Sequence, residues 1–407
     1  MQAIPSVHFP TTTVTNYIYT LVTVIKMKFS CTQENLRQGL SIVSHIANRS
    51  INLPILENVL IKTEEGGLKL MTTNLEMAIS CTIRSKIENK GDFTVPSKLF
   101  SDYVSLLPKE RVDIEQIDNV FTVSCETYQT RLNGIVAAEF PLIPTVISEQ
   151  KFLVKVNDLR KAINQVIFSV AANESRPEIS GVLFKFQPQG NNLSLILAAT
   201  DSYRLAEKTL SVQVSGDNSL EEQISVIVPA RAVSELVRIL GIFRDVVDLP
   251  ENLEIIVADN QVLFRYSDVE LVSRTIEGKY PDYRQLIPGS FQTEVEVLKE
   301  DLIRAVKATS LFSRVGLNDI NLIFLPDKTV KITATNPQTG EHSAEVISKI
   351  NGKENKITVN YRYLIDGINN IESNEVKINL IDGISPCVLR SVNEKPDYLY
   401  IVMPIRQ

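Results

Sequence analysis

The sequence predicts an α+β protein built from three copies of one domain. Two landmarks recur in step along its 407 residues. The first, with spacings of 127 and 135 residues, is a strand pattern that ends in Thr73-Asn74, Thr200-Asp201 and Thr335-Asn336. The second, with spacings of 133 and 131 residues, is a strand pattern that passes into a helix pattern at Pro96, Pro229 and Asn360. This period matches a whole domain and is too long for a solenoid repeat.

Composition places the chain among ordinary globular proteins. It is 44% hydrophobic and 22% charged, with a net charge of −6. An acidic balance argues against a nucleic-acid binder, unless the basic residues gather on one face. The cysteines have no metal-binding spacing and suit reduced thiols in a cytoplasmic protein. We therefore expect no metal and no cofactor; the four cysteines are Cys31, Cys81, Cys125 and Cys387.

Residues 1–26 stand outside the repeat, which begins at Met27. Their longest apolar stretch is too short for a bilayer, which needs about 20 residues. The stretch also has no basic segment before it and no cleavage site after it. We expect a disordered extension without function; an added β-strand or a targeting segment is the alternative.

Each repeat divides again into two β-α-β-β-β units. We expect one sheet per unit, with helices on one face and solvent on the other. The first unit has a helix pattern over Gln33–Ala47, and the second has one over Ser97–Leu107, which Ser97 can cap. The residues expected to face inward are Leu36, Leu40, Val43 and Ala47; Leu99, Tyr103 and Leu106; Leu159, Ile163 and Val166; Val233, Val237 and Leu240; Leu302, Val306 and Thr309; and Leu364, Ile368 and Ile371.

Proline-rich segments at 139–144 and 279–288 end the first two repeats. Proline interrupts sheet ladders and marks linkers. The domains are therefore expected at 27–146, 151–289 and 292–407.

Sequence motifs of catalysis are absent. The chain has no phosphate-binding loop, no dinucleotide fingerprint, no H-E-x-x-H and no G-x-S-x-G. Acidic residues at helix starts, such as Asp158, Glu300 and Asp301, are explained by the helix dipole. A binding protein is the favoured interpretation. An enzyme with a site at a domain junction, and an interaction scaffold that does not bind DNA, stay open as alternatives.

Several segments, in this order and on a threefold repeat, resemble the bacterial DNA polymerase III beta subunit, the sliding clamp of the DNA clamp family. They are Met27-Lys28-Phe29, Leu53–Leu56, Thr73–Met77, Thr200–Leu205, Tyr280–Tyr283 and Tyr400–Arg406.

The resemblance implies a homodimeric ring whose helices line a hole for duplex DNA, bound without regard to sequence. Such a protein is a processivity factor and not an enzyme. Its implied partners are the alpha subunit of the replicative polymerase, the clamp loader, repair polymerases and other proteins with clamp-binding peptides. The implied DNA contacts are Arg49, Arg176 and Arg231.

The resemblance also implies a pocket for a partner peptide and a ring-closing contact. Ring closure is expected to pair an edge strand at Thr127–Leu132 with one in the region Leu311–Asn321, which includes Leu311 and Phe312. The pocket residues implied are Ile179, Thr200, Ser202, Tyr203, Arg204, Leu205, Pro281, Gln285, Leu286, Asn360, Tyr363, Ile384, Pro386, Ile401, Val402, Met403, Pro404, Ile405 and Arg406.

Overall fold

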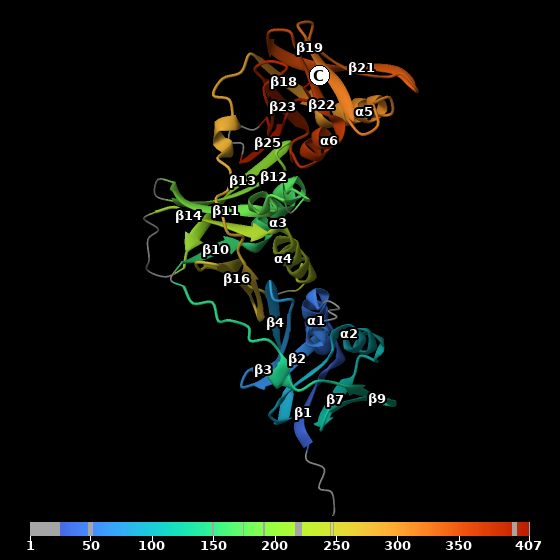
Figure 1. Cartoon of the computed structure of the whole chain (residues 1–407), viewed down its shortest axis with the longest axis vertical. Coiled ribbons are helices and arrows are strands. Elements are labelled where there is room, and N and C mark those ends of the chain that lie inside the picture. Colours follow the sequence, from blue (N-terminus) through green and yellow to red (C-terminus); the bar gives the residue numbers. More distant parts are fainter. Residues whose placement is uncertain are drawn as a thin grey trace, which may run out of the picture.

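The chain forms an arc of three domains, with the helices on its concave side and the sheets on the other (Figure 1). This computed structural model describes residues 25–47, 52–148, 150–173, 175–189, 192–215, 222–244, 246, 248–392 and 397–406. The extension expected at residues 1–26 lies almost wholly outside the described residues. The first strand, β1, begins at Ile25, two residues before Met27.

The six predicted β-α-β-β-β units are present, two in each domain. Domain 1 has β1 (Ile25–Thr32), α1 (Gln33–Val43), β2 (Asn58–Glu64), β3 (Gly67–Thr73), β4 (Met77–Ile83), then β6 (Asp92–Pro96), α2 (Ser97–Leu106), β7 (Arg111–Ile117), β8 (Val120–Cys125) and β9 (Tyr128–Asn133). A short strand, β5 (Lys86–Asn89), lies between its halves.

The other two domains repeat this order. Domain 2 has β10 (Lys151–Lys155), α3 (Val156–Val166), β11 (Gly181–Gln189), β12 (Asn192–Thr200), β13 (Arg204–Val214), then β14 (Ile224–Pro229), α4 (Ala230–Ile242), β15 (Asn252–Val257), β16 (Gln261–Tyr266) and β17 (Val269–Arg274). Domain 3 has β18 (Thr293–Leu298), α5 (Lys299–Ser310), β19 (Asp319–Leu325), β20 (Thr329–Asn336), β21 (Gly340–Gly352), then β22 (Asn355–Asn360), α6 (Tyr361–Asn369), β23 (Glu375–Leu380), β24 (Cys387–Ser391) and β25 (Tyr398–Val402).

The expectation of one sheet per unit is wrong, because the halves of each domain exchange their opening strands. In domain 1, β1 pairs with β7 of the second half, and β6 pairs with β2 of the first. The same exchange joins β10 to β15 and β11 to β14 in domain 2, and β18 to β23 and β19 to β22 in domain 3. Each sheet therefore depends on both halves, so the whole domain is the unit that folds.

Helix packing follows most of the predicted inward positions, although Ala47, beyond the end of α1, and Val237 are only half-buried, and α2 departs furthest. There the buried side chains are Phe100 and Val104, whereas Leu99 and Leu106 are 56% and 80% exposed. The buried stripe of α2 therefore runs through Phe100 and Val104, each one residue after the predicted Leu99 and Tyr103. The predicted cap is also wrong: Pro96 occupies the N-cap position, and Ser97 is fully buried within the first turn.

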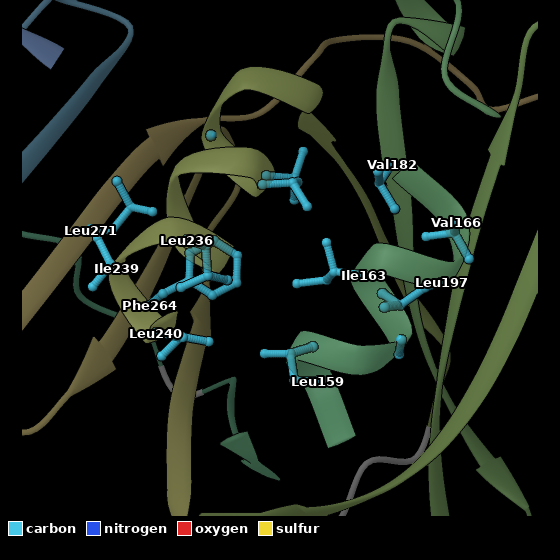
Figure 2. Close-up of a cluster of buried hydrophobic side chains, with 14 of the residues drawn as sticks. Leu159, Ile163, Val166, Val182, Leu197, Leu236, Ile239, Leu240, Phe264 and Leu271 are labelled. Carbon is cyan, nitrogen blue, oxygen red and sulfur yellow. The ribbon is translucent and has the colours of Figure 1, made fainter. Parts of the chain in front are cut away.

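In domain 2 the two helices pack face to face over the sheets. Figure 2 shows Leu159 and Ile163 of α3 lying opposite Leu236 and Leu240 of α4, and all four are buried. Each such side chain stabilises the fold by about 1.5–3 kcal/mol relative to its exposed state. These side chains belong to the core of the domain. Because the apolar faces of both helices are buried there, their polar faces are left on the concave side.

Strand pairing continues across both domain junctions. At the first junction β4 pairs with β17, with Ile79 opposite Leu271. At the second, β13 pairs with β25, with Leu205 opposite Ile401. Backbone hydrogen bonds therefore join neighbouring domains, and this restricts the bending of the arc.

A glycine in α6 marks close packing in domain 3. A Cβ at Gly367 would lie 2.1 Å from ring atoms of Tyr400, whose hydroxyl donates to the carbonyl of Tyr363 at 2.8 Å. The ring cannot withdraw without losing this bond. We expect Gly367→Ala to lower the free energy of unfolding by about 1–3 kcal/mol, as overpacked cores do, in thermal denaturation followed by circular dichroism.

The matched control is Gly241→Ala in α4, where a Cβ meets nothing within 4 Å. Alanine favours a helix by about 1 kcal/mol over glycine, so this variant is expected to unfold at the same or a higher temperature. Equal effects of the two substitutions would contradict the packing argument.

Candidate functional site

The centre of the candidate site is the turn between β12 and β13. The Thr200 hydroxyl donates to the carbonyl of Arg204 at 2.6 Å and accepts from the Ser202 amide at 3.1 Å. The Asp201 carboxylate accepts from the amides of Tyr203 and Arg204, each at 2.9 Å. Threonine and aspartate thus fix a turn whose third residue, Ser202, has a φ of 76°. The turn places Tyr203 in solvent, 64% exposed.

The same turn occurs in domain 1, which explains the repeated landmark. The Thr73 hydroxyl donates to the carbonyl of Met77 at 2.9 Å, and Asn74 accepts from two amides as Asp201 does. Leu75, at the place of Ser202, has a φ of 74°. In domains 1 and 2 the landmark is therefore a hydrogen-bonding requirement of the turn, whereas at Thr335-Asn336 the Asn336 side chain accepts from the Gln338 amide and donates to the carbonyl of Ser313.

The two turns meet the next domain in the same way but present different side chains. The Met403 amide donates to the carbonyl of Tyr203, and the Arg274 amide donates to that of Glu76, both at 2.9 Å. Glu76 and Arg274 therefore stand where the second junction has Tyr203 and Met403. At these matching positions, the junction of domains 2 and 3 has an aromatic ring and a thioether where the first junction has two charged side chains.

Arg204 links domains 2 and 3 at this junction. Its guanidinium bonds to Asp201 at 3.0 Å and to Asp366 of α6, in the next domain, at 2.5 Å. It also lies 4.6 Å from the ring centroid of Tyr363 and 5.4 Å from that of Phe168. Only 13% of its side chain is exposed. The sequence interpretation named Arg204 and Tyr363 but missed Asp366 and Phe168, because nothing in their local sequence marks the contact.

The linker between domains 2 and 3 packs on β12 and β13 through two tyrosines. The Tyr280 hydroxyl donates to the carbonyl of Ala198 at 3.3 Å, and the Tyr283 hydroxyl donates to the carboxylate of Glu207. Burial, together with Glu207, raises the pKa of Tyr283, so the phenol remains a donor at neutral pH. Both tyrosines share one apolar cluster with Leu205 and Met403.

The predicted pocket residues fall into a buried floor and an accessible rim. The floor consists of Ile179, Thr200, Leu205, Ile401 and Val402, each at most 8% exposed. The rim is built from the turn, the linker, the loop before β24, the start of α6 and the last residues. Its half-buried or exposed members are Ser202, Tyr203, Arg204, Pro281, Gln285, Leu286, Asn360, Tyr363, Ile384, Pro386, Met403, Pro404, Ile405 and Arg406.

Backbone bonds bring several of these segments together. Arg204 lies opposite Val402 in the β13–β25 ladder, and Cys387, which follows Pro386, lies opposite Val402 from the other side. The Ile405 amide donates to the carbonyl of Thr358, near the start of α6, at 2.8 Å. The terminal strand is therefore part of the buried core and adjoins the rim of the candidate pocket. No bond links Ile384, Gln285 or Leu286 to the others among the described residues.

A second candidate surface is the concave side, where each helix carries one cation with no described carboxylate or carbonyl partner. The other helix cations have partners. Lys161 pairs with Glu372, Arg238 with Glu235 and Arg304 with Asp301, and the Lys299 ammonium donates to the carbonyls of Asn369 and Ile371. The six unpaired cations are Arg37 (α1), Lys98 (α2), Arg160 (α3), Arg231 (α4), Lys307 (α5) and Arg362 (α6).

The three predicted DNA contacts have different positions. Arg231 is exposed in the first turn of α4. Arg176 bonds to Glu178 and to the hydroxyl of Ser202, each at 3.0 Å, and so lies beside the turn of the candidate pocket. Arg49 lies outside the described residues.

The predicted ring-closing segments lie at opposite ends of the arc (Figure 1). β9 is the edge strand of its sheet; Thr127 before it is exposed, whereas Leu132 is 6% exposed and packs inward. In domain 3, Leu311 is 76% exposed, and Phe312 stacks on His342 with ring centroids 5.4 Å apart.

The expectation of an edge strand within Leu311–Asn321 is wrong. Leu311 follows the end of α5, and β19 is a central strand between β20 and β22. An edge strand in the described part of domain 3 is instead Gly340–Ile347 of β21, which pairs only with β20.

The described residues offer little for chemistry. Among them, no group of three His, Cys, Asp or Glu side chains is placed to hold a metal. Burial raises the pKa of Cys31, Cys81 and Cys387 to about 12, which keeps these thiols protonated. Within the same ranges, no helix is long and apolar enough to cross a membrane.

Comparison with known proteins gives one consistent family. The models of the N-terminal, central and C-terminal domains of the DNA polymerase III beta subunit match residues 27–144, 153–282 and 284–406. The beta sliding clamp of Synechococcus elongatus is 31% identical over 93% of this chain and 99% of its own length. That of Bacillus subtilis is 27% identical over 93% of this chain and 100% of its own.

Solved structures agree. The DNA polymerase sliding clamp of Bacillus subtilis superposes with a TM-score of 0.86 at 25% identity, covering 94% of this chain and 100% of its own. The sliding clamp of Pseudomonas aeruginosa, solved with a ligand, superposes with a TM-score of 0.85 at 27% identity and the same coverage. The chain therefore belongs to the DNA polymerase III beta subunit family, the family of the bacterial beta sliding clamps.

Proposed function

We propose that this protein encircles duplex DNA as a ring of two copies and tethers the replicative DNA polymerase to it in the cytoplasm. The observation that carries the proposal is the concave face, on which all six helices lie, each with an unpaired cation (Figure 1). The family is one of non-enzymatic processivity factors, so the expectation that this chain is not an enzyme agrees with it.

The charge distribution fits a surface that slides. Cations spaced along six helices neutralise phosphates at many weak points, and phosphate contacts carry no sequence information. The net charge of −6 leaves the remaining surface acidic, which disfavours DNA elsewhere. Arg231 and Arg176 act as DNA contacts in this proposal.

Ring closure requires a second copy, because one arc cannot bring its own ends together. An exposed edge strand pairs readily with another chain. In the proposed homodimer, β9 of domain 1, flanked by Thr127, meets β21 of the partner's domain 3. Leu311, exposed in the single chain, and Phe312 pack across the same contact; Leu132 supports β9 from beneath.

The pocket at the junction of domains 2 and 3 is proposed to receive a short peptide with glutamine and apolar anchors. Apolar walls with a few orienting polar groups suit such a ligand, and methionine adapts its shape to several partners. The carriers of that peptide are proposed to be the polymerase alpha subunit, the clamp loader, repair polymerases and other clamp-binding proteins.

The topological prediction is that the protein, once loaded on circular DNA, stays bound and then dissociates when the circle is cut. A ring held by topology is released through a free end, whereas a protein bound by local contacts is retained. Gel filtration of labelled protein with circular and linearised DNA measures the difference. Equal retention on both would reject the sliding clamp, and binding to neither would favour a scaffold that does not bind DNA.

Met403→Ala is expected to weaken binding of a Gln-Leu-type peptide by about 1–2 kcal/mol, or roughly fivefold to thirtyfold in Kd. Met403 is half-buried, so its removal takes away pocket wall without opening the core. Fluorescence anisotropy with a labelled peptide measures the effect. Leu142→Ala is the control, since Leu142 is 98% exposed on the linker of the other junction. Unchanged affinity of Met403→Ala would remove the pocket assignment.

Arg204→Lys is expected to reduce peptide affinity about tenfold and to lower Tm. Lysine keeps one charge but has no planar fork to bond two carboxylates and no planar group to stack on an aromatic ring. The junction then loses part of its link to Asp366. Arg84→Lys, at an exposed position with no described ion pair, is the control. An unchanged Tm together with an unchanged Kd would show that the Arg204 contacts with Asp201 and Asp366 are dispensable.

A further inference from the structure

The two internal junctions of the arc use the same strand register. At the first junction β4 pairs with β17, and this ladder places Ala78 opposite Val272. At the second, β13 pairs with β25 and places Leu205 opposite Ile401. Ala78 and Leu205 are equivalent positions of the repeat, because each also lies opposite the turn threonine in the hairpin of its own domain.

The other strand of each junction carries a landmark of its own. Four residues after Val272, the Ile276 amide donates to a carbonyl of β14 at 2.8 Å. Four residues after Ile401, the Ile405 amide donates to a carbonyl of β22, also at 2.8 Å. Both junctions therefore join the same two positions of the repeat.

The two ends of the arc carry the same landmarks. In domain 1 the Ile135 amide donates to a carbonyl of β6 at 3.1 Å, and the residue four positions before it is Arg131 of β9. In domain 3 the turn threonine, Thr335, lies opposite Glu341 of β21. These are the two strands proposed above to close the ring. The register of the internal junctions therefore places Glu341 of one copy opposite the partner's Arg131.

The length and charge of the two strands suit this register. A ladder as long as the internal ones would join Gly340–Ala344 to the partner's Tyr128–Leu132, which lies within β9 and the unpaired edge of β21. Arg131 and Glu341 are both exposed, and neither forms an ion pair with a described residue. Opposite charges directly across a ladder attract, whereas like charges repel.

The helix of each second half also contacts the neighbouring domain through one stripe. In α6 this stripe is Tyr363, Asp366 and Asn370. The ring of Tyr363 and the carboxylate of Asp366 contact Arg204 of domain 2. The carbonyl of Asn370 accepts from the Gln165 side chain of domain 2 at 2.8 Å. All three members of the stripe therefore touch the next domain.

The stripe is buried at the same positions in α4. Counted from the residue that ends the preceding strand, the equivalents are Ala232, Glu235 and Ile239, each at most 4% exposed. The Glu235 carboxylate lies 2.7 Å from Nδ1 of His45 in domain 1. The stripe thus contacts a neighbouring domain at both internal junctions.

In α2 the same stripe has no neighbour. Its members are Leu99, Asp102 and Leu106, and all three are exposed. The domain 3 equivalent of His45, counted from the start of the first helix, is Leu311, which is exposed as well. Exposed apolar side chains at positions that are covered in the other two domains indicate an interaction surface.

We propose that a second copy of this chain binds in the register of the internal junctions. The partner's Arg131 then lies opposite Glu341, and the partner's Leu99 and Leu106 pack on Leu311. This recognition presupposes the ring proposed above and adds the residues that select the second copy. Two copies form the contact twice, once at each end of the arc.

The test is charge reversal across the contact. Arg131→Glu and Glu341→Arg are each expected to raise the Kd of the dimer about tenfold, because like charges then face each other in both contacts. An equimolar mixture of the two variants is expected to regain the wild-type Kd, since every contact again joins opposite charges. Sedimentation velocity with fluorescence detection, over a dilution series, measures these Kd values.

Glu345→Arg is the matched control, because Glu345 is exposed on the same strand but faces the uncharged Thr127 of the partner in this register. Its dimer is expected to keep the wild-type Kd. An equal loss in Glu345→Arg and Glu341→Arg reflects net charge and overturns the register. Failure of the mixture to recover also overturns it, since Arg131 and Glu341 then do not face each other.

The helix part of the contact is tested by Leu106→Ser, which is expected to raise the Kd of the dimer about tenfold. Ile147→Ser is the control, because Ile147 is 86% exposed on the linker between domains 1 and 2. An unchanged Kd of Leu106→Ser overturns the helix contact. Wild-type protein that stays monomeric at every concentration overturns the ring itself, whereas a wild-type dimer that tolerates both charge reversals overturns only the register.

Discussion

Strand pairing across the domain junctions is the constraint on which the rest of the structure depends. The β4–β17 and β13–β25 ladders join neighbouring domains by backbone hydrogen bonds, which do not depend on side chains. They fix the curvature of the arc and place all six helices on one side (Figure 1). The concave cationic surface and the proposed pocket are both consequences of where these ladders put the domains.

The proposed pocket illustrates how one junction of a repeated structure can differ from another. The same Thr-Asx turn meets the same strand position at both junctions, with matching 2.9 Å bonds from Arg274 and Met403. The turn is therefore part of the scaffold, and the difference lies in the side chains it carries. Charged residues at the first junction keep it hydrated, whereas Tyr203 and Met403 leave an apolar surface that a peptide can bury.

Arg204 connects this surface to the rigidity of the arc. Because it is bonded to Asp201 and Asp366 and lies close to two aromatic rings, it is a positioning residue more than a free donor. Arg176 bonds to Ser202 of the same turn, so the segment proposed to contact DNA adjoins the one proposed to contact partners.

The sequence by itself determined the threefold repeat, the six β-α-β-β-β units and most of the inward helix faces, because these follow from local periodicity and turn chemistry. It did not determine that the halves exchange strands, that Phe100 displaces Leu99 from the core, or that part of β21 is an edge of domain 3. Only the tertiary structure decided these, together with the partners of Arg204. The physical reason is that strand pairing and ion pairing join residues far apart in the chain, and no local pattern records them.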